Sequence, residues 1–271
     1  MQSPAPKLEV LISAMDIRSE EQLPPVAGQV LSEGCKGLVI NQAKRPPAFE
    51  TRSKNLRVFH LEERGISRSR NRALDHALGD LLLLTDDDVE LLDGFSRKIA
   101  EAFERNPEAD MITFQSLNQR GEKRKAYSDR SFRHNLRSLM RVSSIEVALR
   151  RKSLEKNPLC FDERFGLGSQ FPTGSETVFL SDALSKGFHI HYCPEAIVRH
   201  PDDSSGRALF QNEELMEAKG AMFYRIFGWK AYAICIYFAL RKRKETGYSL
   251  YHSMKLMYSG IDQFKESGDD R

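Results

Sequence analysis

The sequence predicts an α/β fold built on a mostly parallel sheet. Residues 81–84 are four consecutive leucines, and a continuous apolar run of this kind fits a strand buried on both faces of a parallel sheet. On both sides of this run, short apolar segments alternate with amphipathic segments of helical spacing, which is the order of β-α-β units. The chain of 271 residues is long enough for one such domain with an appendage.

Each expected element follows from the spacing of its apolar residues and from the Gly or Pro residues that mark its ends. Strands are expected at 7–14, 37–41, 56–61, 81–85, 110–114 and 188–193. Helices are expected within 20–33 and at 66–78, 95–106 and 176–186. We therefore expect a main domain over 1–207, with a first half to about 114 and a second half from about 115 to 207, and a C-terminal helical extension over 208–271.

Composition excludes several classes of protein. Lys and Arg number 41 against 38 Asp and Glu, a formal charge of +3, so we expect no nucleic-acid partner. The four cysteines form no CxxC pair, which argues against a zinc knuckle or a thioredoxin-like motif. The first residues lack a hydrophobic signal core, and no apolar run reaches the roughly 18 residues of a membrane span. A cytoplasmic protein is expected.

Three adjacent carboxylates, Asp86, Asp87 and Asp88, follow the leucine strand directly. In an open α/β sheet the carboxyl ends of the strands form the ligand-binding edge, and three like charges there repel one another unless a cation relieves them. Oxygen ligands favour Mg²⁺, Mn²⁺ or Ca²⁺ over zinc. An acidic loop that only turns the chain and caps the next helix is the alternative.

Two further segments carry candidate site residues. Residues 64–71 place three arginines and two serines at the expected start of a helix, which suits a diphosphate, although a solvated basic helix face explains the same residues. Residues 165–174 form a glycine-rich loop before a helix whose first turn carries Glu176. This carboxylate can serve as a general base towards a hydroxyl, or it can simply complement the helix dipole.

The order of these motifs resembles the family 2 glycosyltransferases, which have the GT-A fold. The resemblance covers about Leu8 to Pro201. It rests on polar ends after the first two strands at 14–16 and 41, a G-x-S-x-x-R-N segment at 65–71, the aspartates at 86–88, a glycine and an acidic residue at 174–176, and P-x-x-x-x-x-H at 194–200.

The resemblance implies a role for each candidate residue. Asp86, Asp88 and His200 look like the metal site, and Glu176 matches the catalytic base. The donor-binding residues would be Asp16, Asn41, Gly65, Arg70, Asn71 and Asp87. The loop facing the acceptor would carry Gly166, Gly168 and Gly174.

The implied reaction is metal-dependent transfer of a sugar to an acceptor hydroxyl with inversion, using Mn²⁺ or Mg²⁺. A UDP-sugar is the favoured donor and a glycan or lipid-linked molecule the acceptor, in surface polysaccharide or glycolipid synthesis. Two departures from the family pattern are Ser175 before Glu176, where a second carboxylate is common, and Asn41 where aspartate is common. They leave two alternatives, a catalytically silent nucleotide-sugar-binding protein and a nucleotidyltransferase.

The C-terminal extension contains an apolar stretch at 231–240 followed by four basic residues at 241–244. Ten residues cannot span a bilayer, but an apolar helix with a basic end can lie on the inner face of an anionic membrane. Peripheral membrane contact through 223–244 is therefore one expectation. Packing against the main domain and a homodimer contact are the alternatives.

Overall fold

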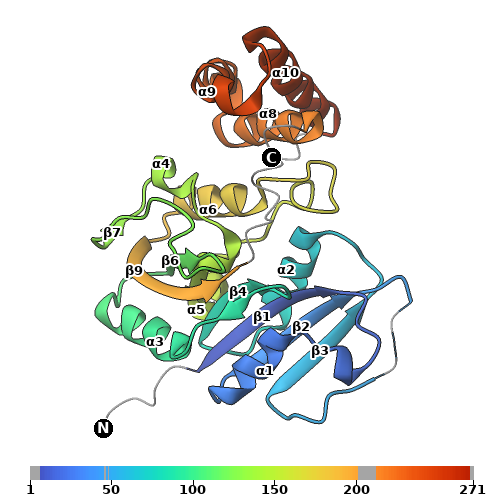
Figure 1. Cartoon of the computed structure of the whole chain (residues 1–271), viewed down its shortest axis with the longest axis vertical. Helices are drawn as coiled ribbons and strands as arrows, with labels where there is room; N and C mark the ends of the chain where they lie inside the picture. The colour runs from blue at the N-terminus through green and yellow to red at the C-terminus, as the bar shows by residue number, and fades with distance from the viewer. Residues whose placement is uncertain (1–6, 46, 48, 201–211, 269–271) are drawn as a thin grey trace.

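The computed structural model describes residues 7–45, 47, 49–200 and 212–268 (Figure 1). Its centre is a nine-stranded mixed sheet in the order β3-β2-β1-β4-β8-β6-β9-β5, with β7 paired to β9. The strands are β1 Leu8–Met15, β2 Lys36–Gln42, β3 Leu56–Leu61, β4 Leu81–Asp86, β5 Glu90–Leu91, β6 Met111–Leu117, β7 Phe132–Arg133, β8 Val147–Arg150 and β9 Ile190–Arg199. Strands β1 to β4 run parallel, as the sequence predicts, and β8 is antiparallel to both β4 and β6.

Helices cover both faces of the sheet. One face packs on α1 Pro25–Ser32 and α3 Phe95–Arg105, and the other on α2 Ile66–His76 and α6 Ser175–Ser185. The four leucines of β4 are at most 1% exposed because their side chains alternate between these two cores. The predicted α/β fold with a largely parallel sheet is confirmed.

Short helices complete the main part of the chain. They are the 3-10 helices η1 Glu20–Gln22 and η2 Ser144–Glu146, and the α-helices α4 Leu136–Leu139 and α5 Arg151–Lys156. The helix expected within 20–33 is thus split in two, because Pro25 occupies the first position of α1 and starts that helix afresh.

The C-terminal part is helical, as predicted, and its helices lie together at the top of Figure 1. They are α8 Glu213–Phe227, η3 Gly228–Lys230, α9 Ala231–Thr246 and α10 Leu250–Glu266. Gly220 of α8 faces the backbone of Met257, and Gly260 of α10 faces the backbone of Glu217, so closely that a Cβ atom at either glycine would overlap it. A third core joins these helices to Phe165, Phe171 and Val178 of the main part.

Candidate active site

The carboxyl ends of the parallel strands bring the predicted donor residues to one edge of the sheet. In the strand register Ser13 of β1 lies opposite Asp86 of β4, while Ala14 lies opposite Asn41 of β2. Asn41 in turn lies opposite His60 of β3. The aspartates and the polar ends of β1 and β2 are therefore neighbours, as expected for a ligand-binding edge.

Asn41 is fully buried and its amide is occupied. Its Oδ1 accepts from the backbone N–H of Ile17 at 3.0 Å, and its Nδ2 donates to the Ile17 carbonyl at 2.8 Å. The same Nδ2 lies 2.9 Å from Nδ1 of His60, so both amide hydrogens have partners. Asn41 thus fixes the backbone that follows β1, and its side chain presents no unused hydrogen to a ligand.

Asp16 lies in the segment that Asn41 fixes. It has a positive φ of 54°, and its backbone N–H donates to the Gln42 carbonyl at 3.0 Å. Its half-exposed carboxylate pairs with Arg18 at 3.3 Å and with Arg64 at 3.0 Å. Asp16 therefore links the end of β1 to the residues just before α2.

Arg70 of α2 is buried and holds the first aspartate of the acidic triplet. Its Nη2 donates to Asp86 Oδ1 at 3.0 Å and to Ser144 Oγ at 2.7 Å. Its Nε is buried and has no hydrogen-bond partner among the described residues. The guanidinium therefore orients Asp86 and keeps one donor unused at the ligand-binding edge.

Two other polar side chains of α2, Ser67 and Asn71, clamp the segment that leads to α6. Asn71 donates to the Phe161 carbonyl at 3.0 Å and accepts from the Phe161 N–H at 2.7 Å. Ser67 donates to the Phe165 carbonyl at 2.6 Å, so the 2.8 Å contact between its Oγ and Ser175 Oγ must be donated by Ser175. The 65–71 motif thus connects the acidic triplet to the start of the helix that carries Glu176.

The acidic triplet has the electrostatics of a cation site. Burial raises the pKa of Asp87, and the charges of Asp88 and Asp86 raise it further. The exposed carboxylate of Asp88 lies 3.7 Å from Nε2 of the largely buried His200. Over the described residues, no group of three or more His, Cys, Asp or Glu side chains is arranged to hold a metal ion. Asp88 and His200 are thus two predicted metal residues that the structure brings close together.

Glu176 lies in the first turn of α6 and is partly buried. Lys219 of α8 is close enough to interact with its charge. Burial lowers the pKa of Lys219, and the carboxylate of Glu176 opposes that shift. The C-terminal helices thus bring a titratable lysine near the predicted base.

Two of the predicted loop glycines are explained by close packing. Gly166 has a φ of 107°, and a Cβ there would overlap the Ile66 side chain. Gly174 has a φ of 91°, and a Cβ there would lie 2.8 Å from Sδ of Met222 on α8. The positive φ and the small space both require glycine, so these residues press the loop against α2 and α8.

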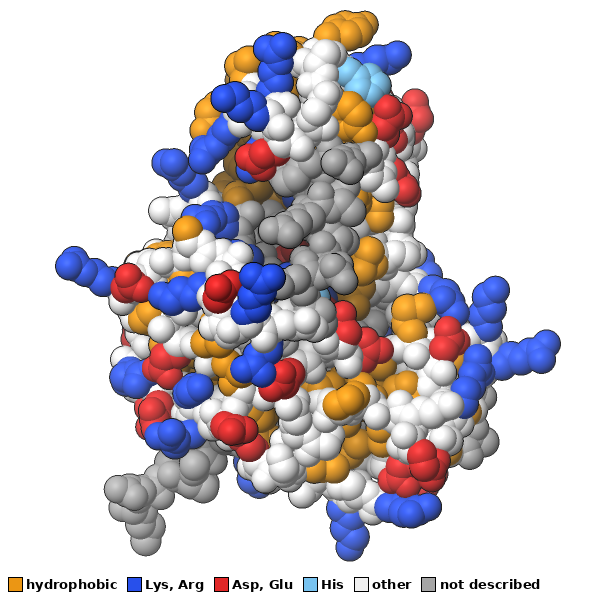
Figure 2. All heavy atoms as spheres, viewed as in Figure 1, with side chains coloured by type: hydrophobic (Ala, Val, Ile, Leu, Met, Phe, Trp, Pro, Cys, Tyr) orange, Lys and Arg blue, Asp and Glu red, His pale blue; other side chains and the backbone are white. Residues whose placement is uncertain are grey.

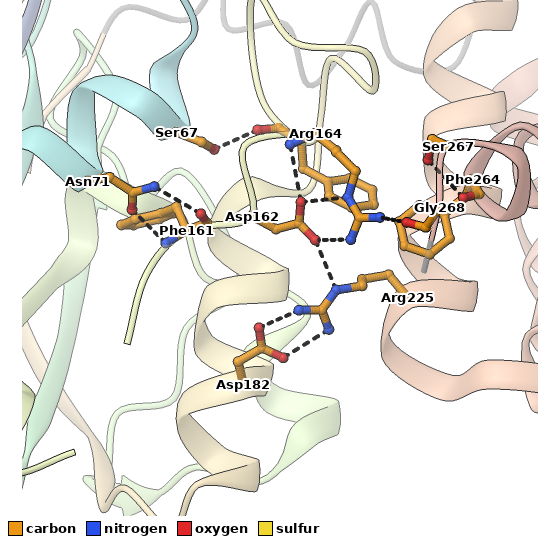
Figure 3. Close-up of polar contacts among 11 residues, drawn as sticks. Ser67, Asn71, Phe161, Asp162, Arg164, Asp182, Arg225, Phe264, Ser267 and Gly268 are labelled. Carbon is orange, nitrogen blue, oxygen red and sulfur yellow. Dashed lines mark hydrogen bonds and ion pairs between the residues drawn. The ribbon is translucent and has the colours of Figure 1, made fainter. Parts of the chain in front are cut away.

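An ion-pair network ties α6 and the residues just before the glycine-rich loop to the C-terminal part of the chain (Figure 3). Arg225 of α8 makes two hydrogen bonds to Asp182 of α6, at 2.8 and 3.1 Å, and a third to Asp162 at 2.9 Å. Asp162 also accepts from Arg164 at 2.7 Å, and Arg164 donates to the Gly268 carbonyl at 2.9 Å. Although burial raises the pKa of Asp162, its contacts with the two arginines outweigh burial and lower it.

Replacing Arg225 by Met is expected to destabilise the protein by about 3 kcal/mol, because it removes the arginine that pairs with Asp182 and leaves Asp162 with Arg164 alone. The side chains of Asp162 and Arg225 are only 8% and 21% exposed. Urea unfolding measures the loss. The matched control is Arg97→Met on α3, where a 74%-exposed arginine pairs with Glu101 at 3.6 Å and the expected loss is below about 1 kcal/mol. Equal losses for the two variants would contradict this account of the network.

Basic residues between positions 120 and 151 line a pocket of about 490 Å³ in the second half of the domain. Aromatic and basic side chains share its wall, among them Lys125, Tyr127, Phe132, Arg137, Arg141 and Tyr192. The buried Glu146 carboxylate accepts from Lys125 at 2.8 Å and from Tyr127 at 2.6 Å. Arg137 and Arg141 are exposed, so the pocket carries positive charge that Glu146 does not neutralise.

Sequence reasoning did not single out Lys219, Met222 or Arg225 as parts of this site. All three lie on α8, far along the chain from Glu176, and helical periodicity does not say which distant residue a helix face will meet. The i, i+3 and i, i+6 spacing from Lys219 to Met222 and Arg225 does place them along one side of α8.

Comparisons with known proteins agree with this architecture. The family model described as glycosyl transferase family 2 matches residues 42–168. A comparison with curated proteins found no significant match. Among solved structures, residues 1–349 of S. aureus TarS superpose with a TM-score of 0.60 at 14% identity, covering 98% of this chain and 93% of that one. The same fragment in complex with UDP-GlcNAc gives the same TM-score, identity and coverage.

A structure titled S. aureus TarS also superposes, with a TM-score of 0.59 at 14% identity, and the match covers 96% of this chain and 55% of that chain. At this level of identity the structural similarity establishes the fold, which is the predicted GT-A architecture. The family match spans residues 42–168, which contain the 65–71 motif and the acidic triplet. The chain therefore has the fold of the glycosyltransferases it superposes on and matches the family 2 model over residues 42–168, as the order of its motifs predicts.

Proposed function

We propose that this glycosyltransferase moves a sugar from a UDP-activated donor to an acceptor hydroxyl, with a divalent cation at the donor diphosphate and with inversion at the anomeric carbon. The observation that carries the proposal is the approach of Asp88 and His200 to 3.7 Å. These residues are far apart in the sequence and meet at the same edge as Asn41 and Arg70. The UDP-GlcNAc complex of TarS, which shares the fold, supports the choice of a UDP-sugar.

The chemistry of the two side chains fits such a cation. A separation of 3.7 Å between the carboxylate oxygen and the imidazole nitrogen lets one ion with bonds of about 2.1 Å touch both. Two protein ligands suffice where substrate phosphates and water complete the coordination. A divalent cation held there supplies Lewis-acid stabilisation of the diphosphate leaving group.

The donor is held by residues from three strand ends in this proposal. Arg70 would orient Asp86 towards the ribose or the sugar through its Nη2, while its buried Nε–H has no partner among the described residues. Asn41 acts indirectly, by fixing the backbone at Asp16 and Ile17 against which the nucleoside would lie. This indirect role accounts for an amide at a position where the family commonly has aspartate.

Glu176 would take the proton from the attacking hydroxyl. Glu176 lies in the first turn of α6, at the positive end of the helix dipole, and Lys219 of α8 is near enough to interact with its charge. Proton removal raises the nucleophilicity of the hydroxyl oxygen as it attacks the anomeric carbon opposite the diphosphate. One carboxylate suffices for this direct displacement, so Ser175 can serve as a link to Ser67 instead.

The glycan or lipid-linked acceptor would approach across the pocket lined by Tyr127, Phe132 and Arg137. Two contacts support this direction. Ser144, which accepts from Arg70, begins the short helix η2 that ends at the pocket residue Glu146. On its other side the pocket is bounded by α4, which packs against α6. The pocket thus adjoins both the donor aspartate and the helix of the base.

The proposal is tested by thermal unfolding of the whole chain with UDP, GDP, UDP-GlcNAc and UDP-glucose, each with Mn²⁺ and with EDTA. A ligand that binds only the folded state raises the melting temperature. We expect a UDP compound to do so with Mn²⁺ and to lose the effect in EDTA. If GDP alone stabilised the protein, the donor would carry guanine and not uracil. If none of the nucleotides stabilised it, the donor site would be refuted.

A further inference from the structure

The outer face of α9 exposes large apolar side chains. Ile236, Tyr237 and Leu240 are 38%, 59% and 56% exposed, and Trp229, just before the helix, is 77% exposed. They are four of the nine exposed large hydrophobic residues among those the structure describes. In Figure 2 apolar and basic side chains gather over the top of the molecule, where Figure 1 places α9.

The inner face of α9 is already buried against its neighbouring helices. Ala231, Cys235 and Ala239 recur every four residues and are at most 1% exposed, in the core that α9 shares with α8 and α10. Residues 231–240 contain no charged side chain, so the outward face of these turns has none of the charged residues that a surface helix normally presents to water. A helix that is apolar on both faces requires a second partner for the outer one.

The charge around this face is of one sign. Residues 228–244 contain five basic residues, Lys230, Arg241, Lys242, Arg243 and Lys244, and no Asp or Glu. The first acidic residue beyond them is Glu245, which pairs with Lys242 at 2.7 Å. The partner must therefore offer an apolar layer beside anionic groups.

We propose that α9 lies in the interface of an anionic membrane, with Trp229, Ile236, Tyr237 and Leu240 among the acyl chains and the basic run 241–244 at the phosphate headgroups. No described helix is long and apolar enough to cross a membrane, so the contact is peripheral. Trp and Tyr are suited to this depth because their rings are apolar and their polar atoms stay near water.

A second copy of the chain fits the face less well. If the outer face of α9 met the same face of another molecule, the five basic residues of 228–244 would find no carboxylate in the opposing segment. Anionic lipid headgroups supply that charge throughout the plane of the membrane. The proposal goes beyond the transfer reaction, since it assigns a surface that contains none of the donor or base residues.

Membrane contact through α9 would also orient the site. The helix α8 carries Lys219 and Met222 against the Glu176 segment, and its Arg225 is bonded to Asp162 and Asp182. Since α8, α9 and α10 share one core, the helix at the lipid surface and the base helix are parts of one packed assembly. The acceptor side of the enzyme would then face a lipid-linked acceptor at a fixed height.

The test is co-sedimentation of the full chain with phosphatidylcholine vesicles and with vesicles in which about one third of the lipid is phosphatidylglycerol. We expect binding to the anionic vesicles alone. Ile236→Ser with Leu240→Ser should weaken it at least about tenfold, and Arg241→Gln with Arg243→Gln roughly thirtyfold. The matched controls are Leu78→Ser, where an equally exposed leucine is changed, and Arg52→Gln with Arg97→Gln, and both should leave binding unchanged.

Failure to bind anionic vesicles would overturn the proposal, as would equal binding by the control and test variants. Analytical ultracentrifugation gives the competing result. A dimer that Ile236→Ser with Leu240→Ser dissociates, without vesicle binding, would assign the face to a second copy. Nucleotide-induced stabilisation, measured on the same samples, reports the donor site separately, so failure at the membrane and failure at the donor site are distinguishable.

Discussion

Replacing Glu176 by Gln is expected to lower sugar transfer by about 10²- to 10⁴-fold while leaving donor affinity unchanged, because the amide cannot accept the proton of the acceptor hydroxyl. The substitution keeps the size of the side chain and its place in the first turn of α6. Transfer is measured as nucleotide released per enzyme under saturating donor, and affinity by titration calorimetry.

Glu104→Gln is the matched control, since Glu104 is an exposed carboxylate on α3, on the other face of the sheet. It should transfer at the wild-type rate. If Glu176→Gln also kept the wild-type rate, Glu176 would not be the base. A wild-type protein that binds donor without any turnover would support the catalytically silent protein that Ser175 and Asn41 leave open.

Asp88→Ala is expected to weaken metal-dependent donor binding at least about 100-fold, because loss of a direct ligand should exceed the 10- to 100-fold that loss of an outer-shell partner costs. His200→Ala should act in the same direction, since its Nε2 is the nitrogen beside Asp88. Calorimetric titration of UDP in the presence of Mn²⁺ measures both effects.

A histidine at the opposite end of the same strand provides the control for His200. His189 immediately precedes β9, the strand that ends just before His200, and its backbone carbonyl accepts from Met111. His189→Ala should therefore leave Mn²⁺-dependent UDP binding unchanged. Equal affinity in wild type and Asp88→Ala would show that the aspartate does not hold the cation.

The elements with strong local signals could be predicted from sequence. The strand at 56–61 has the same bounds in the structure, and α2, α3 and α6 each differ from expectation by one or two residues at an end. Strand β9 runs to Arg199, beyond the expected end at Cys193, although Pro194 lies inside it. Its pairing with β6 shifts register between Thr113 and Gln115, and such an irregularity accommodates a proline that cannot donate to the ladder.

The candidate-site residues that belong to the ordered motifs could be predicted from the sequence. Those whose neighbours are set by tertiary packing could not. Asp88 and His200 follow from that order, and the structure brings them together. For Asn71 the resemblance implies donor binding, whereas its amide is bonded to the Phe161 backbone. The proximity of Lys219 to the charge of Glu176 depends on how α8 docks against α6, which no local pattern specifies.

The most direct test of the account is donor hydrolysis, in which water takes the place of the unidentified acceptor. Release of UDP from UDP-GlcNAc and UDP-glucose would be followed with Mn²⁺ and with EDTA, in the wild-type chain and in Glu176→Gln. We predict slow release that requires Mn²⁺ and falls at least about 100-fold in the variant. Release that persists in EDTA, or that the variant sustains at the wild-type rate, would contradict metal-dependent transfer with Glu176 as base.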